Sequence, residues 1–364
     1  MSSVRDDMRT LWYDDATRQL KIIDQTRLPH QRQIVVIEML EQACDAIVHM
    51  QVRGAPLIGI TAAFGVHLAL KQDPDTLDSA CEMLAKTRPT AVNLHWALSR
   101  LAEGLVSVPP AQRAEAALEM ARTMLAEDAA ACSEIGDFGL ALLRDLLDAK
   151  QARGGENRLN VLTHCNAGWL ATGAWGTALA PIYKAHQAGL PVHVWVDETR
   201  PRNQGASLTA WELAQSGVPH TLIVDNAGGH LMQHGQVDVC LVGSDRTTAH
   251  GDVCNKIGTY LKALAAYDNQ VPFYVALPTS TIDFAIEDGL RDIPIEERAT
   301  DEVSHVPGID GAGALHRVAI APPGTHISNF GFDVTPARLV SGLITEKGIF
   351  PATAQGLLDI KAWL

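Results

Sequence analysis

Two residues able to do acid–base chemistry follow short apolar runs in the second half of the chain. Cys165 comes just after the run NVLT, and Asp245 follows VDVCLVG. Such runs are typical of buried strands, so both residues are predicted at strand carboxyl ends. A helix N-terminus and nearby cations lower the pKa of a thiol, whereas an apolar enclosure raises the pKa of a carboxyl group and lets it act as an acid. We therefore predict a thiolate at Cys165, facing a helix that begins near Trp169, and a general acid at Asp245.

Each of these residues also has a structural interpretation. Cys165 could be a packed core thiol, and Asp245 could cap a helix or pair with Arg246. His164 should point to the opposite face of its strand from Cys165, because side chains alternate along a strand. We expect a structural role for His164, and position alone leaves both interpretations of Cys165 open.

Two arginines each stand before a proline and a predicted helix. Arg53 precedes Gly54, Ala55 and Pro56 in QVRGAPLIG, and Arg88 has the corresponding place in TRPTAVN. Free backbone N–H groups at a helix N-terminus and a forked guanidinium both favour phosphate. Gly54 would let a ligand approach the backbone closely. Taken alone, a solvent-exposed arginine before a helix explains RGAP equally well.

Polar side chains gather after two further apolar runs. The loop after VHVWV is dense in hydrogen-bonding groups, which either bind a polar ligand or form ion pairs that hold the loop's own shape. They are Asp197, Glu198, Arg200, Arg202, Asn203 and Gln204. In GDVCNKIGT, Asn255 and Lys256 introduce another predicted helix, and Lys256 could neutralise a phosphate. Gly168, Gly173 and Gly176 lack the G-x-G-x-x-G spacing of a dinucleotide site, so a nicotinamide cofactor is not expected.

The periodicity of the chain changes near residue 159, which predicts an α/β protein with two parts. The runs TLWYDD, QLKIID and RQIVVIEM predict a short antiparallel sheet, and helices follow, broken at Pro56, Pro89 and the Pro109, Pro110 pair. Beyond residue 159, apolar runs alternate with helical segments, which is typical of a Rossmann-like, doubly wound and mostly parallel sheet. The predicted strands are NVLT, VHVWV, HTLIV, VDVCLVG, VPFYVAL and HRVAIA. We predict an N-terminal strand-and-helix domain (1–131) and a Rossmann-like catalytic domain (132–364).

Composition argues against several classes of protein. The 364 residues are 47% hydrophobic and 20% charged, as in ordinary globular proteins, and a formal net charge of -13 argues against binding nucleic acid through a general basic surface. No apolar stretch is long enough for a membrane, and MSSVRDDMRT lacks the apolar core of a signal peptide, so a cytoplasmic location is expected. The six cysteines form no C-x-x-C pair and no zinc-like array, so no metal site is expected.

Taken together, the motifs RGAP, TRPTAVN, THCNAG, DETRP-x-x-QGA-x-LTAWEL and GSDR…GDVCNKIGT resemble the methylthioribose-1-phosphate isomerases, aldose–ketose isomerases of methionine salvage. The resemblance extends from the N-terminal sheet to PARLVSGLITEKGIF and covers nearly the whole chain. This family is related to the regulatory subunits of a eukaryotic translation-initiation exchange factor and to ribose-1,5-bisphosphate isomerase, with which it shares a Rossmann-like half. The resemblance implies a small sugar-phosphate substrate, no cofactor or metal, and a homodimer.

Carried over residue by residue, the resemblance assigns roles to the positions singled out above. It makes Asp245 the proton donor and Cys165 the group that assists at the transition state. It assigns substrate contacts to Arg53, Gly54, Ala55, Arg88, Gln204, Asn255 and Lys256. His250 and Ser244 stand where Asn and Ala are usual, so the rim of the site or its substrate preference could differ.

The implied substrate poses a chemical problem, because phosphate on its anomeric oxygen prevents ring opening to a free aldehyde. We expect Asp245 to protonate the ring oxygen as the ring C–O bond breaks. Hydrogen then moves from C2 to C1, either through proton removal by Cys165 to give a phosphoenolate or as a hydride shift, and the sequence leaves both routes open. The alternatives are an isomerase of ribose 1,5-bisphosphate or 5-deoxyribose 1-phosphate, and a non-catalytic regulatory subunit, although a binding scaffold has no need of an acid–thiol pair.

Overall fold

The first part of the chain is a three-stranded antiparallel sheet packed against helices, in a computed structural model that describes residues 8–364. The strands β1 (Leu11–Asp14), β2 (Gln19–Ile23) and β3 (Ile34–Ile37) all fall in the runs predicted as strands. The helices that follow are α1 (Leu40–Val48), α2 (Ala55–Gln72), α3 (Leu77–Ala85), α4 (Val92–Leu105) and α5 (Pro110–Ala152). Three of them begin at the predicted proline breaks: α2 has Pro56 in its first turn, α4 begins after Pro89, and α5 begins at Pro110, because proline is tolerated before a helix or within its first turn.

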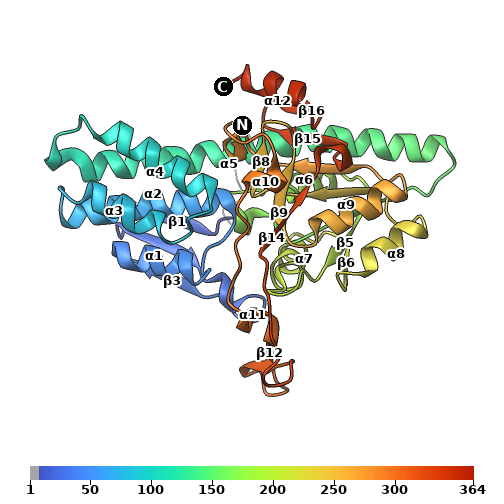
Figure 1. Cartoon of the computed structure of the whole chain (residues 1–364), viewed down its shortest axis with the longest axis horizontal. Coiled ribbons are helices and arrows are strands. Elements are labelled where there is room, and N and C mark those ends of the chain that lie inside the picture. The colour runs from blue at the N-terminus through green and yellow to red at the C-terminus, as the bar shows by residue number, and fades with distance from the viewer. Residues whose placement is uncertain (1–7) are drawn as a thin grey trace.

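Helix α5 joins the two parts of the molecule and is 43 residues long. Its first half contributes Leu118 and Met124 to a core shared with the N-terminal sheet and α1 to α4. Its second half contributes Cys132 and Leu143 to a separate core beneath the main sheet. Figure 1 shows α5 running along the upper side of both parts. The boundary between residues 131 and 132 coincides with this change of core but lies inside one helix, so the division into two domains stays a prediction.

The second part is built on a seven-stranded sheet in the order β16-β15-β10-β7-β4-β5-β6, parallel except for the β15–β16 pair. Its strands are β4 (Leu159–Thr163), β5 (Val192–Asp197), β6 (His220–Ile223), β7 (Val239–Val242), β10 (Phe273–Ala276), β15 (Gly342–Thr345) and β16 (Gly348–Phe350). This arrangement confirms the predicted α/β fold with a mostly parallel sheet.

Helices cover both faces of this sheet, and the side chains of each strand alternate between them. In β4, Val161 joins the core of α5 and α6, whereas Leu162 joins the core on the other face, beneath α8 and α9. The helices of this part are α6 (Leu179–Gln187), α7 (Ala210–Gln215), α8 (Ala227–Gln233), α9 (Thr259–Asp268) and α12 (Ala354–Lys361). Within residues 8–364, every helix is too short or too polar to cross a membrane.

Two smaller sheets lie outside the main one. Strands β11 (Ile282–Asp283), β8 (Arg246–Thr248), β9 (Val253–Lys256) and β14 (Phe332–Thr335) form one sheet in that order. Strands β12 (His305–Ile309) and β13 (Leu315–Ala319) form a hairpin that projects at the lower end of Figure 1, next to the short helix α11 (Asp301–Ser304). Another short helix, α10 (Gly289–Asp292), precedes it.

The prediction that HRVAIA belongs to the parallel sheet is wrong. This run contains β13, which pairs with β12 instead. Asp310 forms the turn between the two strands by accepting hydrogen bonds from the backbone N–H groups of Ala312 and Ala314, each at 2.9 Å. Because of this turn, β13 pairs with β12 in an antiparallel hairpin. The strand that pairs with β10 in the parallel sheet is β15.

Candidate active site

Cys165 and Asp245 line one pocket, which lies beyond the carboxyl ends of β4 and β7. This central pocket has a volume of about 30 Å³ and is enclosed by the start of α2, the loop after β4 and the loop after β7. Arg53, Gly54 and Ala55 also line it. The structure thus brings the predicted thiol and carboxyl group to the same hollow, as expected from the shared edge of a parallel sheet.

The backbone of Cys165 is held in an unusual conformation by two threonine hydroxyls. Its φ of 63° lies in the left-handed region, which non-glycine residues rarely adopt. The Cys165 N–H donates a hydrogen bond to Thr199 Oγ1 at 2.8 Å, and Thr209 Oγ1 donates one to the Cys165 carbonyl at 2.6 Å. Strained residues of this kind persist where surrounding structure fixes them, and they cluster at functional sites.

The expectation of a helix near Trp169 is wrong. Residues Trp169–Ala171 form one turn of 3-10 helix, and α6 begins only at Leu179. The segment between them is a loop that packs closely against α5. A Cβ added at Gly173 would lie 2.9 Å from the carbonyl oxygen of Leu125 in that helix. The helix N-terminus that lines the central pocket together with Cys165 is instead that of α2, which begins at Ala55.

Burial is the largest influence on the pKa of both candidate catalytic groups, and it raises both values. It raises the pKa of the Cys165 thiol, and the attraction of Arg53 and Lys256 for a thiolate only partly offsets this effect. The predicted thiolate is therefore wrong, because desolvation disfavours the charged form. Burial also raises the pKa of Asp245, against the effects of Lys256, Arg53 and Arg88, and this agrees with the predicted acid. Arg246 lies 3.6 Å from Asp283 in an ion pair.

Arg53 and Gly54 take their positions from the loop that follows β4. Arg53 is buried, and its Nη1 and Nη2 donate hydrogen bonds to Oδ1 and the carbonyl oxygen of Asn166, at 2.6 and 2.8 Å. Gly54 has a φ of 101°, and a Cβ placed there would lie 2.4 Å from the carbonyl oxygen of Ala171. Gly54 is thus required for packing against Ala171, and it also lines the central pocket, so its contact with a ligand stays a prediction.

Asn255 and Lys256 lie at the end of β9, three or four residues before α9 begins at Thr259. Asn255 lines the central pocket, and its Nδ2 donates a hydrogen bond to Thr259 Oγ1 at 3.1 Å. Lys256 is buried, with Nζ 2.8 Å from the carbonyl oxygen of Gly331 and 4.8 Å from the centre of the Phe332 ring. Burial lowers the pKa of Lys256, while Cys165 and Asp245 act in the opposite direction.

Arg88 lies in a second pocket, which shares Ala55 and Asp245 with the central one. Its Nη2 donates to Glu296 at 3.0 Å, and its Nε is buried without a hydrogen-bond partner among the described residues. Leaving a buried polar group without a partner costs about 1–3 kcal/mol. Arg88 thus has a donor that a ligand could satisfy.

Gln204 lies in a third pocket, of about 280 Å³, which shares Arg53 with the central pocket and reaches the β12–β13 hairpin. Gln204 is buried, and its Oε1 has no hydrogen-bond partner among the described residues. The predicted substrate contacts other than Lys256 therefore line the central pocket or one of two hollows that share residues with it, and Lys256 is close enough to act on the pKa of Cys165 and Asp245.

The two arginines of the same loop are engaged elsewhere. Arg200 Nη2 donates to the carbonyl oxygen of Val303 at 2.7 Å, and Arg202 Nη1 lies 2.8 Å from Glu302 Oε1. Both contacts fasten the loop to the base of the hairpin. The ion-pair interpretation thus describes Arg202, whereas Arg200 is held by a backbone carbonyl oxygen.

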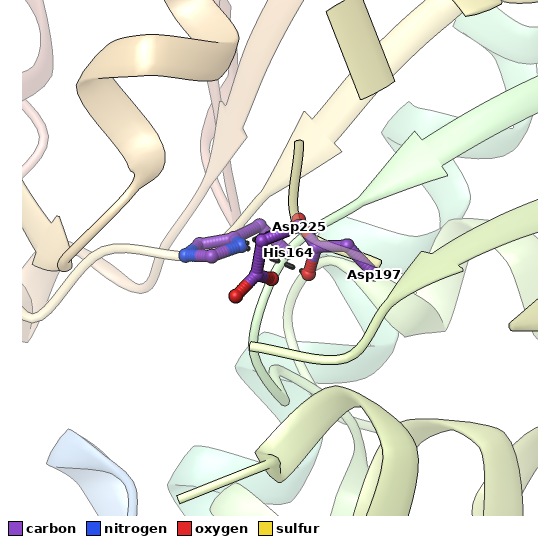
Figure 2. Close-up of side chains that lie close together, drawn as sticks. All are labelled: His164, Asp197 and Asp225. Carbon is purple, nitrogen blue, oxygen red and sulfur yellow. Dashed lines mark hydrogen bonds and ion pairs between the residues drawn. The ribbon is translucent and has the colours of Figure 1, made fainter. Parts of the chain in front are cut away.

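A cluster of charged side chains lies beside the strand ends, as Figure 2 shows for His164, Asp197 and Asp225. Their possible metal-ligand atoms lie within 4.8 Å of one another. Lys262 already supplies a cation there, with Nζ 2.8 Å from Asp197 and 3.9 Å from Asp225. His164 donates through Nδ1 to Asp197 at 2.7 Å, and its Nε2 lies 2.8 Å from the Ile257 carbonyl oxygen. Despite burial, His164 and Lys262 hold the pKa of Asp197 at about 2, and the cluster is internally balanced.

Sequence reasoning missed several residues that shape the site. Glu212 of α7 contacts the loop after β4, and Asn166 connects that loop to Arg53. Glu296 binds Arg88 from far along the chain. A lone acidic residue in the apolar segment LTAWEL was a usable signal for Glu212, whereas nothing local marked Glu296.

Comparison with known proteins identifies the family. A model of the initiation factor 2 subunit family matches residues 51–352, and the chain belongs to this family. The methylthioribose-1-phosphate isomerase of Rhodospirillum rubrum is 61% identical, over 97% of this chain and 91% of that protein. The corresponding protein of Escherichia coli is 55% identical, over 97% and 95%. These matches confirm the resemblance to the methylthioribose-1-phosphate isomerases that the motifs indicated.

A solved structure gives the same result. The crystal structure of 5-methylthioribose 1-phosphate isomerase from Pyrococcus horikoshii superimposes with a TM-score of 0.83 at 36% identity, covering 98% of this chain and 96% of that one. The similarity covers both parts of the molecule.

Proposed function

We propose that this protein converts 5-methylthioribose 1-phosphate to 5-methylthioribulose 1-phosphate, an aldose–ketose isomerisation of methionine salvage. The observation that carries the proposal is the central pocket, which Cys165, Asp245 and Arg53 line together. Lys256 is close enough to act on the pKa of both Cys165 and Asp245. The 61% identity to the isomerase of Rhodospirillum rubrum supports this choice of substrate.

Asp245 is the proposed general acid. Burial raises its pKa, which keeps a proton available in a pocket that excludes most water. The proton goes to the ring oxygen as the bond between that oxygen and C1 breaks, so the departing oxygen becomes a hydroxyl group. A positioned acid of this kind contributes roughly 10²–10⁴-fold to the rate.

Cys165 is the proposed partner in moving hydrogen from C2 to C1. As a base it would take the C2 proton and leave a phosphoenolate intermediate, which gains a proton at C1 while its C2 hydroxyl group loses a proton to give the ketone. In the other route the C2 hydrogen moves with its electron pair to C1, and the C2 hydroxyl loses its proton to become the ketone. The raised pKa of Cys165 supports the hydride route, since the base must first become a thiolate. Substrate deuterated at C2 tests this, because a hydride shift retains the label at C1.

Arg53, Lys256 and Arg88 are the proposed phosphate-binding cations. Each is buried, and Arg88 has a donor without a partner among the described residues. A pocket of about 30 Å³ holds only about two water molecules. Substrate binding must therefore widen the central pocket, and the two adjoining hollows offer space for this.

The direct test is to incubate the purified protein with 5-methylthioribose 1-phosphate and follow the ketose signal by NMR. Ribose 1,5-bisphosphate and 5-deoxyribose 1-phosphate, assayed in parallel, distinguish the related isomerases. No turnover of any of the three would favour a regulatory subunit. The observation behind this alternative is the similarity to the crystal structure of translation initiation factor eIF-2B, subunit delta, from A. fulgidus, which has a TM-score of 0.78.

Two further properties belong to the proposal. A homodimer is expected from the family resemblance, and light scattering on the purified protein tests it. A cytoplasmic location is expected as well. All six cysteines are free thiols, which suits a reducing compartment.

A further inference from the structure

The carboxylate of Glu212 lies at the centre of the loop that carries the candidate catalytic thiol. Glu212 belongs to α7 and is fully buried. Its Oε1 accepts hydrogen bonds from Asn166 Nδ2 at 2.8 Å and from the Leu170 N–H at 3.1 Å. Its Oε2 accepts from the Trp169 N–H at 2.9 Å and from the Tyr183 hydroxyl at 2.8 Å. Burial raises the pKa of Glu212 to about 7, and these four hydrogen bonds, which match the acceptor capacity of an ionised carboxylate, oppose that rise.

The loop is also shaped to fit this carboxylate closely. A Cβ added at Gly168 would lie 2.0 Å from Glu212 Oε2, so only a glycine lets the backbone pass there. One side chain thus holds three successive parts of the loop between β4 and α6. A buried polar network of this kind rigidifies a loop when every member has a hydrogen-bond partner.

Glu212 also sets the orientation of the Asn166 amide. Because the Asn166 nitrogen must face the acceptor Glu212, its oxygen faces Arg53, and it accepts from Arg53 Nη1 at 2.6 Å. The reversed amide would place its N–H groups against a guanidinium, which has no acceptor. Hydrogen bonds thus connect the buried carboxyl group of Glu212, through Asn166, to Arg53, a proposed phosphate-binding cation.

We propose that Glu212 is a positioning residue for the isomerisation, which holds the Asn166 amide and through it aims the Arg53 guanidinium into the central pocket. The proposal rests on the function proposed above, since it assigns Arg53 to the substrate. Glu212 does not line the pocket and takes no part in bond making. Its effect should appear in substrate binding more than in the chemical step.

Glu212→Gln is the test variant, because it keeps the shape but replaces one acceptor oxygen with an NH2 group, which cannot accept from the donors around it. Its KM for 5-methylthioribose 1-phosphate should rise about tenfold or more with a smaller change in kcat, and Arg53→Ala, which removes the phosphate-binding guanidinium itself, should do the same. Tyr183→Phe is the matched control, since it removes a hydrogen bond from the same carboxylate without touching the loop. It should lower the thermal unfolding temperature while leaving KM unchanged. If both variants lose stability and neither changes KM, Glu212 is merely structural and the proposal is overturned.

Asn166→Ala tests the connection independently and keeps the proposal falsifiable if Glu212→Gln does not fold. It should raise KM as Glu212→Gln does, and the double variant should be no worse than either single one, because both remove the same link. An unchanged KM in Asn166→Ala, or fully additive effects, would overturn the proposal. Wild-type protein that fails to turn over 5-methylthioribose 1-phosphate would instead refute the proposed function, so the two failures are distinguishable.

Discussion

Replacing Gly54 with alanine should damage both stability and catalysis, and the size of the effect follows from two costs. The φ of 101° is strained for any residue with a side chain, and such strain costs about 1–3 kcal/mol. The added methyl group would lie 2.4 Å from the Ala171 carbonyl oxygen, and overpacking of this kind costs about 1–3 kcal/mol. Together they amount to about 2–6 kcal/mol, a large part of a typical total stability of about 5–15 kcal/mol.

The measurement is urea unfolding combined with steady-state kinetics. Ala171 lines the central pocket, so any relief of the contact by movement of Ala171 deforms the pocket and lowers kcat/KM. Gly189→Ala is the matched control, because its φ is 78° and no atom lies within 4 Å of the added Cβ. It should lose only about 1–2 kcal/mol and keep its activity. Equal destabilisation of the two variants, with normal activity in Gly54→Ala, would refute the reasoning.

Three further predictions concern titratable groups. Cys165→Ser and Asp245→Asn should each lower kcat at least about 100-fold with little change in the urea midpoint, and near-normal turnover in either would contradict its role. Wild-type kcat should fall as pH rises through the raised pKa of Asp245, because the acid must carry its proton. Lys256→Met removes a charge that lowers this pKa, so the fall should move to higher pH, and a fall that stays in place would count against the effect. Burial raises the pKa of Asp128 on α5 from 3.8 to about 7. Protonated Asp128 therefore adds to the free energy of unfolding, and this contribution is fully present below pH 3.8 and lost as pH rises through about 7. Asp128→Asn should therefore gain about 1–2 kcal/mol relative to wild type between about pH 5 and pH 8, less than the full shift implies because the group is partly exposed; a difference independent of pH would disprove this.

The sequence was sufficient to predict that Cys165 and Asp245 meet. Each follows an apolar run, and the carboxyl ends of parallel strands must share one edge of the sheet whatever the details of packing. The proline breaks likewise predicted where α2 and α5 begin, because proline acts locally. Rules of this kind depend on chain connectivity and backbone chemistry, which a single sequence contains.

Features that depend on a balance between distant groups were not predictable. The pKa of Cys165 is set by burial against the charges of Arg53 and Lys256, and neither burial nor distance can be read from residue order. The run HRVAIA looks like a buried strand, yet the turn at Asp310 commits it to a hairpin. Similarly, the spacing of NAGWLATGAWG resembles a helix, but the loop follows the Glu212 carboxylate instead.

The length of α5 has a mechanical consequence. A continuous helix of 43 residues extends over about 65 Å, and its opposite ends are embedded in different cores. If either core unfolds, one end of α5 loses its packing contacts. The helix then packs less stably against the other core as well. Heat or denaturant should accordingly take the molecule apart in a single step, and neither half should survive as an independently expressed fragment.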